Sequence, residues 1–182
     1  MRILITGLDG FTGPYVQSEM EAHGHIVTGL NSNLTNADAV AAEIKLKSPE
    51  AVVHLAGITF INNANANAFY DVNLIGTRNL LAALAKHAPK VQSILLASSA
   101  SVYGNNSGGI LSEENVPDPA NDYAVSKLAM EKMANLWNEQ LPIFILRLFN
   151  YTGVNQDIRF LIPKIVSHFQ ENKPVIKLGN LD

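Results

Sequence analysis

The sequence predicts an α/β protein whose core is a doubly wound parallel sheet covered by helices on both faces, a three-layer sandwich. Short, nearly continuous apolar runs alternate with longer stretches of helical pattern along the 182 residues. Unbroken apolar runs are typical of strands that are buried on both faces. Strands separated by helices are expected to lie parallel, because each helix returns the chain in a right-handed crossover.

Five strands and five helices are expected, in alternating order. The strands are residues 2–6, 25–30, 51–56, 92–97 and 143–148. The helices are residues 13–22, 36–47, 68–87, 123–139 and 159–171. A proline-containing turn and a short strand should follow the last helix, so that the residues after 150 open a second lobe.

The composition excludes several classes of function. The formal net charge is −3 without any cluster of lysine and arginine, which argues against a nucleic-acid partner. Because there are no cysteines, disulfides, thiolate metal sites and thiol nucleophiles are excluded, and no metal site is predicted. The start "MRILITG" is too short an apolar run for a signal peptide, and "PIFILRLF" is too short to cross a bilayer. We therefore expect a cytoplasmic protein without a membrane partner.

Three glycines follow the first expected strand in "ITGLDGFTGPYV", at positions 7, 10 and 13. A strand, a glycine loop and a helix together form a site for pyrophosphate, because the amides at the helix N-terminus have no intrahelical partner and the helix dipole favours an anion. The spacing is G-x-x-G-x-x-G and differs from the G-x-G-x-x-G fingerprint of many dehydrogenases. The alternative is a glycine-rich turn without a ligand.

The stretch "YAVSK" places Tyr123 and Lys127 four residues apart, on one face of the helix expected there. A tyrosine has an unperturbed pKa of about 10, and a nearby ammonium lowers that pKa towards neutrality. The pair can therefore serve as a general acid or base. An ordinary surface helix that happens to carry both residues is the alternative.

Small hydroxyl residues end the fourth expected strand, in "LLASSASVYG". Ligands of parallel sheets bind at the carboxyl ends of the strands, where a serine could hold a reacting oxygen. Ser99 is the candidate, Ser98 and Ser101 compete with it, and a simple polar strand end is the alternative. The glycine loop, the serine and the Tyr–Lys pair all fall at one edge of one sheet, which indicates a single site.

Six motifs in this order resemble the extended short-chain dehydrogenase/reductase superfamily, in its NAD-dependent epimerase/dehydratase family. They are "TGLDGFTG", "HLAG", "NLIGTRNLL", "SSASVYG", "YAVSK" and "RLFNYTG". The resemblance covers essentially the whole chain and implies a Rossmann fold. Residues 1–150 would form an NAD(P)-binding domain, and residues 151–182 would begin an incomplete substrate-binding lobe.

The resemblance also implies roles for single residues. Tyr123 would be the general acid or base, Lys127 would hold the nicotinamide ribose, and Ser99 would bind the reacting oxygen. Asn150 would contact the diphosphate of the substrate, and Arg147 is expected to be structural.

The cofactor-binding set implied by the resemblance extends along the chain. It comprises Gly7, Gly10, Phe11, Thr12, Gly13, Asn31, Asn33, Leu34, Leu55, Ala56, Gly57, Asn73, Tyr123 and Lys127. For Asn73 a structural role is as well supported as one in the site, and His54 is expected to line the cleft with its backbone. After Glu21 there is no acid before Asp38 to bind a ribose hydroxyl, and no lysine or arginine follows until Lys45. The cofactor is therefore predicted as NAD or NADP.

The reaction is narrowed by the residues after the serine. Dehydratases of this family place an acid one or two residues beyond it, whereas Ala100 and Ser101 stand here. The chain is similar to members that reduce GDP-4-keto-6-deoxymannose, which implies a reductase of a 4-keto-6-deoxy sugar carried on a nucleoside diphosphate. A nucleotide-sugar 4-epimerase, similar to UDP-glucose 4-epimerase, is the alternative, and a non-catalytic dinucleotide-binding sensor is a second one. Relatives of this kind imply a homodimer through the helices at 68–87 and 123–139.

Overall fold

The computed structural model describes residues 1–60, 65–105 and 109–178. Its contacts divide the chain into two compact units, Met1–Phe149 and Asn150–Asp182. The first unit contains the sheet and every element that carries the motifs up to "RLF". In residues 150–178, the second unit contains one helix.

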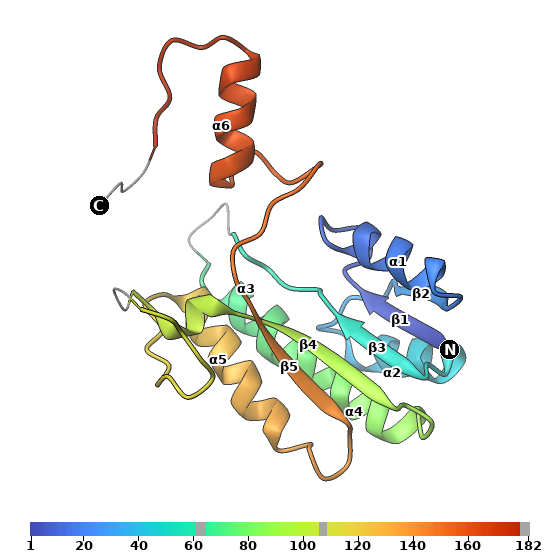
Figure 1. The fold of residues 1–182 in the computed structure, drawn as a ribbon. Coiled ribbons are helices and arrows are strands. Elements are labelled where there is room, and N and C mark those ends of the chain that lie inside the picture. The colour runs from blue at the N-terminus through green and yellow to red at the C-terminus, as the bar shows by residue number, and fades with distance from the viewer. Residues whose placement is uncertain (61–64, 106–108, 179–182) are drawn as a thin grey trace. The chain divides into compact units, whose positions relative to one another are not determined.

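The first unit is built on a five-stranded sheet with the order β2-β1-β3-β4-β5, in which every neighbouring pair is parallel. The strands are β1 Arg2–Thr6, β2 Ile26–Leu30, β3 Ala51–His54, β4 Ser93–Ser99 and β5 Ile143–Leu148. The parallel register brings their carboxyl ends to one edge, where Thr6 pairs with Leu30 and with His54. Figure 1 shows this sheet with helices on its faces. The predicted fold class is confirmed.

Helices pack on both faces of the sheet and form two cores. The larger core joins the sheet to α2 (Ala37–Lys47), α4 (Thr77–His87) and α5 (Asp122–Asn135), and it buries large side chains from all of them. The smaller core packs Ile3 and Ile5 against α1 (Gly13–Ala22). On β5, Phe144 and Leu146 are 54% and 42% exposed, so the first unit leaves part of the sheet open to solvent.

The helix predicted over residues 68–87 is a composite of three segments. It begins with the short helix α3 (Asn67–Phe69), widens into the π-helix η1 (Tyr70–Gly76) and continues as α4. A π-helix admits more residues per turn than an α-helix, and such insertions are frequent at functional sites. Asn73 lies in this π-helical segment and is almost completely buried.

Other boundaries differ from the expectation at the ends of elements. Helix α5 ends at Asn135 instead of residue 139, because the amides of Leu136 and Trp137 bond to carbonyls three residues back and the chain continues in turns up to Gln140. Strand β3 ends at His54, two residues early, since the amide of Ala56 bonds to the Thr6 side chain instead of a strand. Strand β4 continues to Ser99 because it pairs there with Leu148.

The second unit consists of α6 (Leu161–Gln170) and the segments on either side of it. The short strand predicted after α6 is not found in residues 174–178, which adopt no regular structure, and the rest of that stretch lies outside the described residues. A strand needs backbone hydrogen bonds to a neighbouring strand, and none of the strands β1–β5 pairs with this segment. Within the described part of the chain, every helix is too short or too polar to cross a membrane.

Candidate functional site

The loop after β1 is shaped by glycines that have no room for a side chain. Gly7 has a φ of +71°, and a Cβ there would lie 2.9 Å from Cα of Ala56, in the segment after β3. A Cβ on Gly13 would lie 2.2 Å from the carbonyl oxygen of Leu8. The Gly10 amide closes the turn on the Gly7 carbonyl at 3.1 Å. The loop therefore folds tightly onto the N-terminus of α1, whose first turn contains no acidic residue.

A pocket of about 580 Å³ opens beside this loop. Its lining consists of residues 6–9, residues 29–34, Lys47, Ala56 and Val72. Five of the predicted cofactor residues line it, namely Gly7, Asn31, Asn33, Leu34 and Ala56. This volume lies in the range of small-molecule sites, and the glycine turn at its edge suits the close approach of a phosphate.

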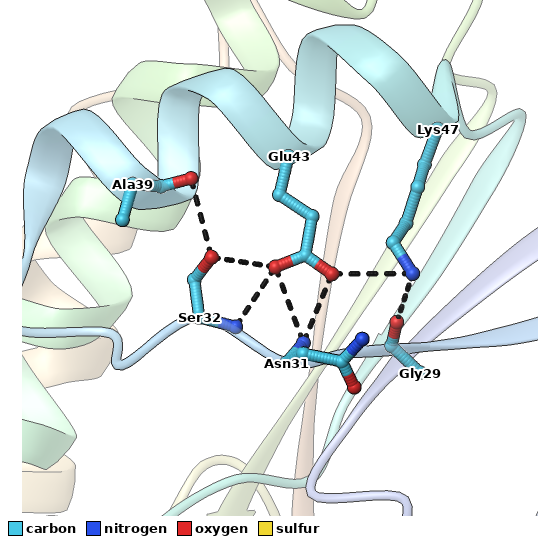
Figure 2. Close-up of polar contacts among 6 residues, drawn as sticks. All are labelled: Gly29, Asn31, Ser32, Ala39, Glu43 and Lys47. Carbon is cyan, nitrogen blue, oxygen red and sulfur yellow. Dashed lines mark hydrogen bonds and ion pairs between the residues drawn. The ribbon is translucent and has the colours of Figure 1, made fainter.

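One wall of the pocket is the turn between β2 and α2, which Glu43 holds in place. The Glu43 carboxylate accepts hydrogen bonds from the amides of Asn31 (3.0 Å) and Ser32 (2.8 Å) and from the Ser32 hydroxyl (2.6 Å). Lys47, one turn along α2, lies 3.1 Å from the same carboxylate and donates to the Gly29 carbonyl at 2.6 Å. Figure 2 shows the carboxylate reaching from the helix to the turn.

The charge of Glu43 is secured by these contacts. Burial alone raises the pKa of its carboxyl, but the hydrogen bonds from Ser32, the amide of Asn31 and Lys47 outweigh burial and lower the pKa to about 2. Glu43 and Lys47 were not among the residues predicted from the sequence, because charged groups were expected directly after β2. Their i, i+4 spacing on the helix was the available signal.

Asn33 and Leu34 continue the same wall. The Asn33 side chain accepts hydrogen bonds from the amide and the hydroxyl of Thr35, each at 3.0 Å. Leu34 is buried, and a Cβ added to Gly76 would lie 2.8 Å from the Cβ of Leu34. The pocket wall thus packs directly against the end of the π-helix.

Lys127 on α5 belongs to a second group of candidate site residues. It is buried, with only 6% of its surface exposed. Its ammonium donates to the Ala97 carbonyl at 2.9 Å. Burial lowers the pKa of Lys127 from 10.5 to about 8. A Cβ on Gly57 would lie 3.1 Å from the ammonium, so the segment after β3 passes directly over the lysine.

Asn73 fixes that segment from the π-helix. Its carboxamide accepts from the Ile58 amide at 2.9 Å, donates to the Ile58 carbonyl at 3.2 Å and donates to the Ser126 hydroxyl at 3.0 Å. The hydroxyl of Ser126 in turn donates to the Tyr123 carbonyl at 2.7 Å. Asn73 therefore ties the segment beside Lys127 to the helix that carries Tyr123 and Lys127.

Tyr123 lies in the first turn of α5, where Asn121 caps the helix by accepting from the Ala124 amide. Its ring packs edge-on against Phe69, with 6.0 Å between ring centroids. The neighbouring Asp122 accepts a hydrogen bond from the Tyr70 hydroxyl at 2.8 Å. The start of α5 is thus held by α3 and η1, a contact that the sequence motifs do not reveal.

The three candidate serines differ in their surroundings. Ser98 is buried and donates to Glu131 in the core. Ser99 accepts from the Ser101 amide at 3.1 Å and so caps the short 3₁₀-helix Ala100–Tyr103, while Ser101 is exposed. Ser98 is therefore a structural residue, and its hydroxyl is used inside the protein.

Glu131 joins three elements beneath this edge of the sheet. Its carboxylate accepts hydrogen bonds from Nε of Arg147 at 3.0 Å and from Nη2 at 2.7 Å. The other guanidinium nitrogen, Nη1, donates to the Tyr103 hydroxyl at 2.8 Å. The hydrogen bonds to Glu131 raise the pKa of Arg147 further above its ordinary value. Arg147 has structural contacts, and Glu131, one turn after Lys127, was missed by sequence reasoning.

His54 contributes a buried side chain instead of backbone alone. Thr77 donates to the Asn73 carbonyl at 2.7 Å, so its oxygen accepts from Nε2 of His54 at 2.8 Å. Nδ1 of His54 then accepts from the Thr6 hydroxyl at 2.6 Å. Burial, and secondarily the charge of Lys127, lowers the pKa of His54 to about 3. The imidazole is a neutral link between β1, β3 and α4.

The remaining predicted residues lie close to these groups or outside the unit. Phe11 and Thr12 lie in the glycine loop, and Leu55 lies in the segment after β3. Asn150 belongs to the second unit, so its role stays a prediction. Among residues 1–60, 65–105 and 109–178, no group of histidines and carboxylates could hold a metal ion.

Comparison with known proteins gives a consistent assignment. A model described as "NAD dependent epimerase/dehydratase family" matches residues 3–182. GDP-6-deoxy-D-talose 4-dehydrogenase of Aggregatibacter actinomycetemcomitans is 38% identical over the whole chain, which covers 64% of that protein. GDP-6-deoxy-D-mannose reductase of Pseudomonas aeruginosa is 33% identical over the whole chain, which covers 62% of it.

A solved structure extends the comparison to the fold. RMD from Pseudomonas aeruginosa, complexed with NADPH, superimposes with a TM-score of 0.85 at 31% identity, over the whole chain and 65% of that protein. The chain thus spans 62–65% of the length of these relatives.

Proposed function

Because the chain belongs to the NAD dependent epimerase/dehydratase family, we propose that it binds NAD or NADP and forms the dinucleotide-binding part of an oxidoreductase for nucleotide-diphosphate sugars. One observation carries this proposal. The segment after β3 lines the pocket with Ala56, and its next residue, Gly57, lies directly against the buried ammonium of Lys127. This contact supports a single site that is formed by both the glycine loop and the Tyr–Lys helix.

The chain's own groups suit proton transfer at a carbonyl. When bound, the nicotinamide supplies the hydride that reduces the carbonyl carbon. Tyr123 donates its phenolic proton to the carbonyl oxygen, which becomes a hydroxyl, and Lys127 stabilises the phenolate that remains. Ser99 holds the reacting oxygen by a hydrogen bond. A lysine whose pKa is about 8 is still mostly charged at pH 7 and can act in this way.

The proposed substrate is a 4-keto-6-deoxy sugar on a nucleoside diphosphate, with Asn150 contacting the diphosphate. The names of the two relatives, which both specify a GDP-linked 6-deoxy sugar, support this choice. Ala100 and Ser101 follow Ser99 without a carboxylate, which disfavours a dehydratase. A 4-epimerase is the second candidate, because the family description includes epimerases and the same tyrosine would serve.

The assay that separates these candidates follows the absorbance of reduced nicotinamide. The full-length protein would be incubated with GDP-, UDP- and dTDP-linked sugars and their 4-keto forms. Net loss of reduced cofactor with a 4-keto sugar supports the reductase, whereas a changed sugar without net loss supports the epimerase. Binding of cofactor without turnover of any sugar would favour the dinucleotide-binding sensor.

The variant Tyr123→Phe tests the proposed proton donor. It removes the phenolic proton and leaves the ring against Phe69, so turnover is expected to fall by about 10²-fold or more while cofactor affinity stays unchanged. Steady-state kinetics and cofactor titration by fluorescence measure the two effects. Normal turnover in this variant would contradict the assignment.

A further inference from the structure

We infer that Lys47 gives the adenosine end of the pocket a preference for a dinucleotide with a 2′-phosphate, and that Glu43 is a positioning residue that holds Lys47 and the β2–α2 turn. The inference rests on the proposed function, because it takes the pocket beside the glycine loop as the dinucleotide site. It selects between the two cofactors that the sequence leaves open.

NAD-binding sites of this fold usually present an acid after the second strand, which bonds the ribose 2′-hydroxyl and repels a 2′-phosphate. Here the residue after β2 is Asn31, and the nearby acid, Glu43, comes from α2. Its oxygens accept from two amides, a hydroxyl and an ammonium of the chain itself. Glu43 does not line the pocket, so no acid of this turn faces the ligand.

Lys47 lines the pocket, and its contacts with Glu43 and the Gly29 carbonyl hold its ammonium at the wall. Two of its three N–H groups satisfy these contacts, which leaves one that can point to a phosphate. Glu43 balances the charge of Lys47, so this end of the pocket is neutral overall instead of negative.

Asn31 and Asn33 carry carboxamides, whose N–H groups can donate to phosphate oxygens, and Ser32 adds a hydroxyl. The remaining charged residue of the lining is Asp9, which belongs to the loop after β1. A 2′-phosphate would therefore meet donors and one ammonium at the β2–α2 turn, a set suited to charge-assisted hydrogen bonds.

The test uses two fragments of the cofactors, 5′-AMP and 2′,5′-ADP, titrated into the protein by isothermal calorimetry. The wild-type protein should bind 2′,5′-ADP about tenfold more tightly than 5′-AMP. Lys47→Gln keeps amide donors for Gly29 and Glu43 and removes the charge, so it should bring the ratio of the two affinities close to one. Lys45→Gln is the matched control, because it makes the same change at an exposed position of the same helix.

Glu43→Gln tests the positioning role separately. It should weaken both fragments because it loosens the turn, and 2′,5′-ADP more than 5′-AMP because Lys47 loses the carboxylate that holds its ammonium at the wall, while circular dichroism stays that of the folded protein. Equal binding of both fragments to the wild type, or an unchanged ratio in Lys47→Gln, would overturn the inference. Binding of neither fragment would remove the pocket assignment and the inference together. Lack of turnover on nucleotide sugars, with the fragment preference intact, would overturn only the proposed function.

Discussion

Burial of the Lys127 charge opposes folding. Its ammonium is buried, and burial lowers its pKa from 10.5 to about 8 because the charged form loses hydration inside the protein. Lys127→Met removes the buried charge, so it should raise the free energy of unfolding at pH 7 by roughly 1–2 kcal/mol, after allowing for the lost bond to Ala97. Under the proposed mechanism, the same substitution should abolish turnover. Urea unfolding measures the change in stability.

The difference in stability between the wild type and Lys127→Met should depend on pH. Below pH 8 both folded and unfolded states hold the Lys127 proton, and the penalty is complete. Between pH 8 and 10.5 the folded state loses the proton first, so wild-type stability gains on the variant as the pH rises. Lys132→Met, on the exposed side of the same helix, should leave stability unchanged. A destabilised Lys127→Met protein would show that burial of the charge is not the dominant effect.

His54 should make the protein sensitive to acid. The folded state resists protonation down to a pKa of about 3, whereas an unfolded histidine titrates near 6.5. Stability is therefore complete above pH 6.5 and declines between pH 6.5 and 3, by up to about 1.4 kcal/mol per pH unit. In His54→Gln, the amide oxygen can accept from Thr6 and the amide nitrogen can donate to Thr77, so this part of the decline should disappear.

Denaturant unfolding at several pH values tests the His54 prediction. The control is His23→Gln, which changes an exposed histidine and should keep the wild-type pH curve. An identical acid decline in wild type and His54→Gln would mean that carboxyl groups, and not this imidazole, set the acid sensitivity.

Single residues were predictable from the sequence where a motif defines them, and not where a contact does. Gly7, Tyr123 and Lys127 are recognisable because their spacing has a chemical reason. Glu43 and Glu131 are charged residues inside helices, and such residues are usually exposed to solvent. Only the packing of each helix turns these carboxylates inward, onto the β2–α2 turn and onto Arg147.

At the scale of elements, Glu131 and Arg147 fasten α5 to the edge of the sheet. Arg147→Met would leave the Glu131 carboxylate charged, buried and without its partner, which should destabilise the protein by about 3 kcal/mol or more. The double variant Glu131→Leu/Arg147→Met removes both charges and should recover most of that loss. Thermal and urea unfolding of the two proteins measure the difference.

An exposed ion pair serves as the control for the buried pair Glu131–Arg147. Arg2 and Glu50 form an ion pair in the same unit, but their side chains are largely or partly exposed. Arg2→Met should change the free energy of unfolding by no more than about 1 kcal/mol. If the double variant were as unstable as Arg147→Met alone, the loss of packing would explain the effect better than an unpaired charge.

The five strands of the sheet and the main helices between them were predictable in order and type, because apolar runs and helical periodicity depend on local sequence. The 3₁₀-helix Ala100–Tyr103 was not expected, and the short strand expected after α6 is not found in the described residues. The internal detail of the elements was not predictable. The widening of residues 70–76 into a π-helix leaves the pattern of apolar residues similar to that of an α-helix, yet it carries the buried Asn73. Helix α5 gives way at Leu136 to turns with bonds three residues back, a change that the helical periodicity up to residue 139 does not indicate.

At the scale of the molecule, alternation of strands and helices was sufficient to predict a parallel sheet, since crossover connections allow few other arrangements. The association of whole chains depends on surfaces instead. The proposed homodimer uses the helices around 68–87 and 123–139, where Ile75 and Val125 are exposed apolar side chains on neighbouring elements. An isologous contact would use these residues of both protomers, and each contact across the interface would occur twice.

Sedimentation equilibrium tests this association. The wild-type protein is expected to sediment as a dimer at micromolar concentration, and Val125→Glu should shift it towards the monomer, because the contact would then bury an unpaired carboxylate. Leu46→Glu is the control, since Leu46 is a more exposed apolar residue on α2, outside the proposed contact. A wild-type protein that sediments as a monomer, or a Val125→Glu protein that stays dimeric, would place the association elsewhere or remove it. Equal weakening by both substitutions would indicate that added negative charge, and not the α5 surface, controls assembly.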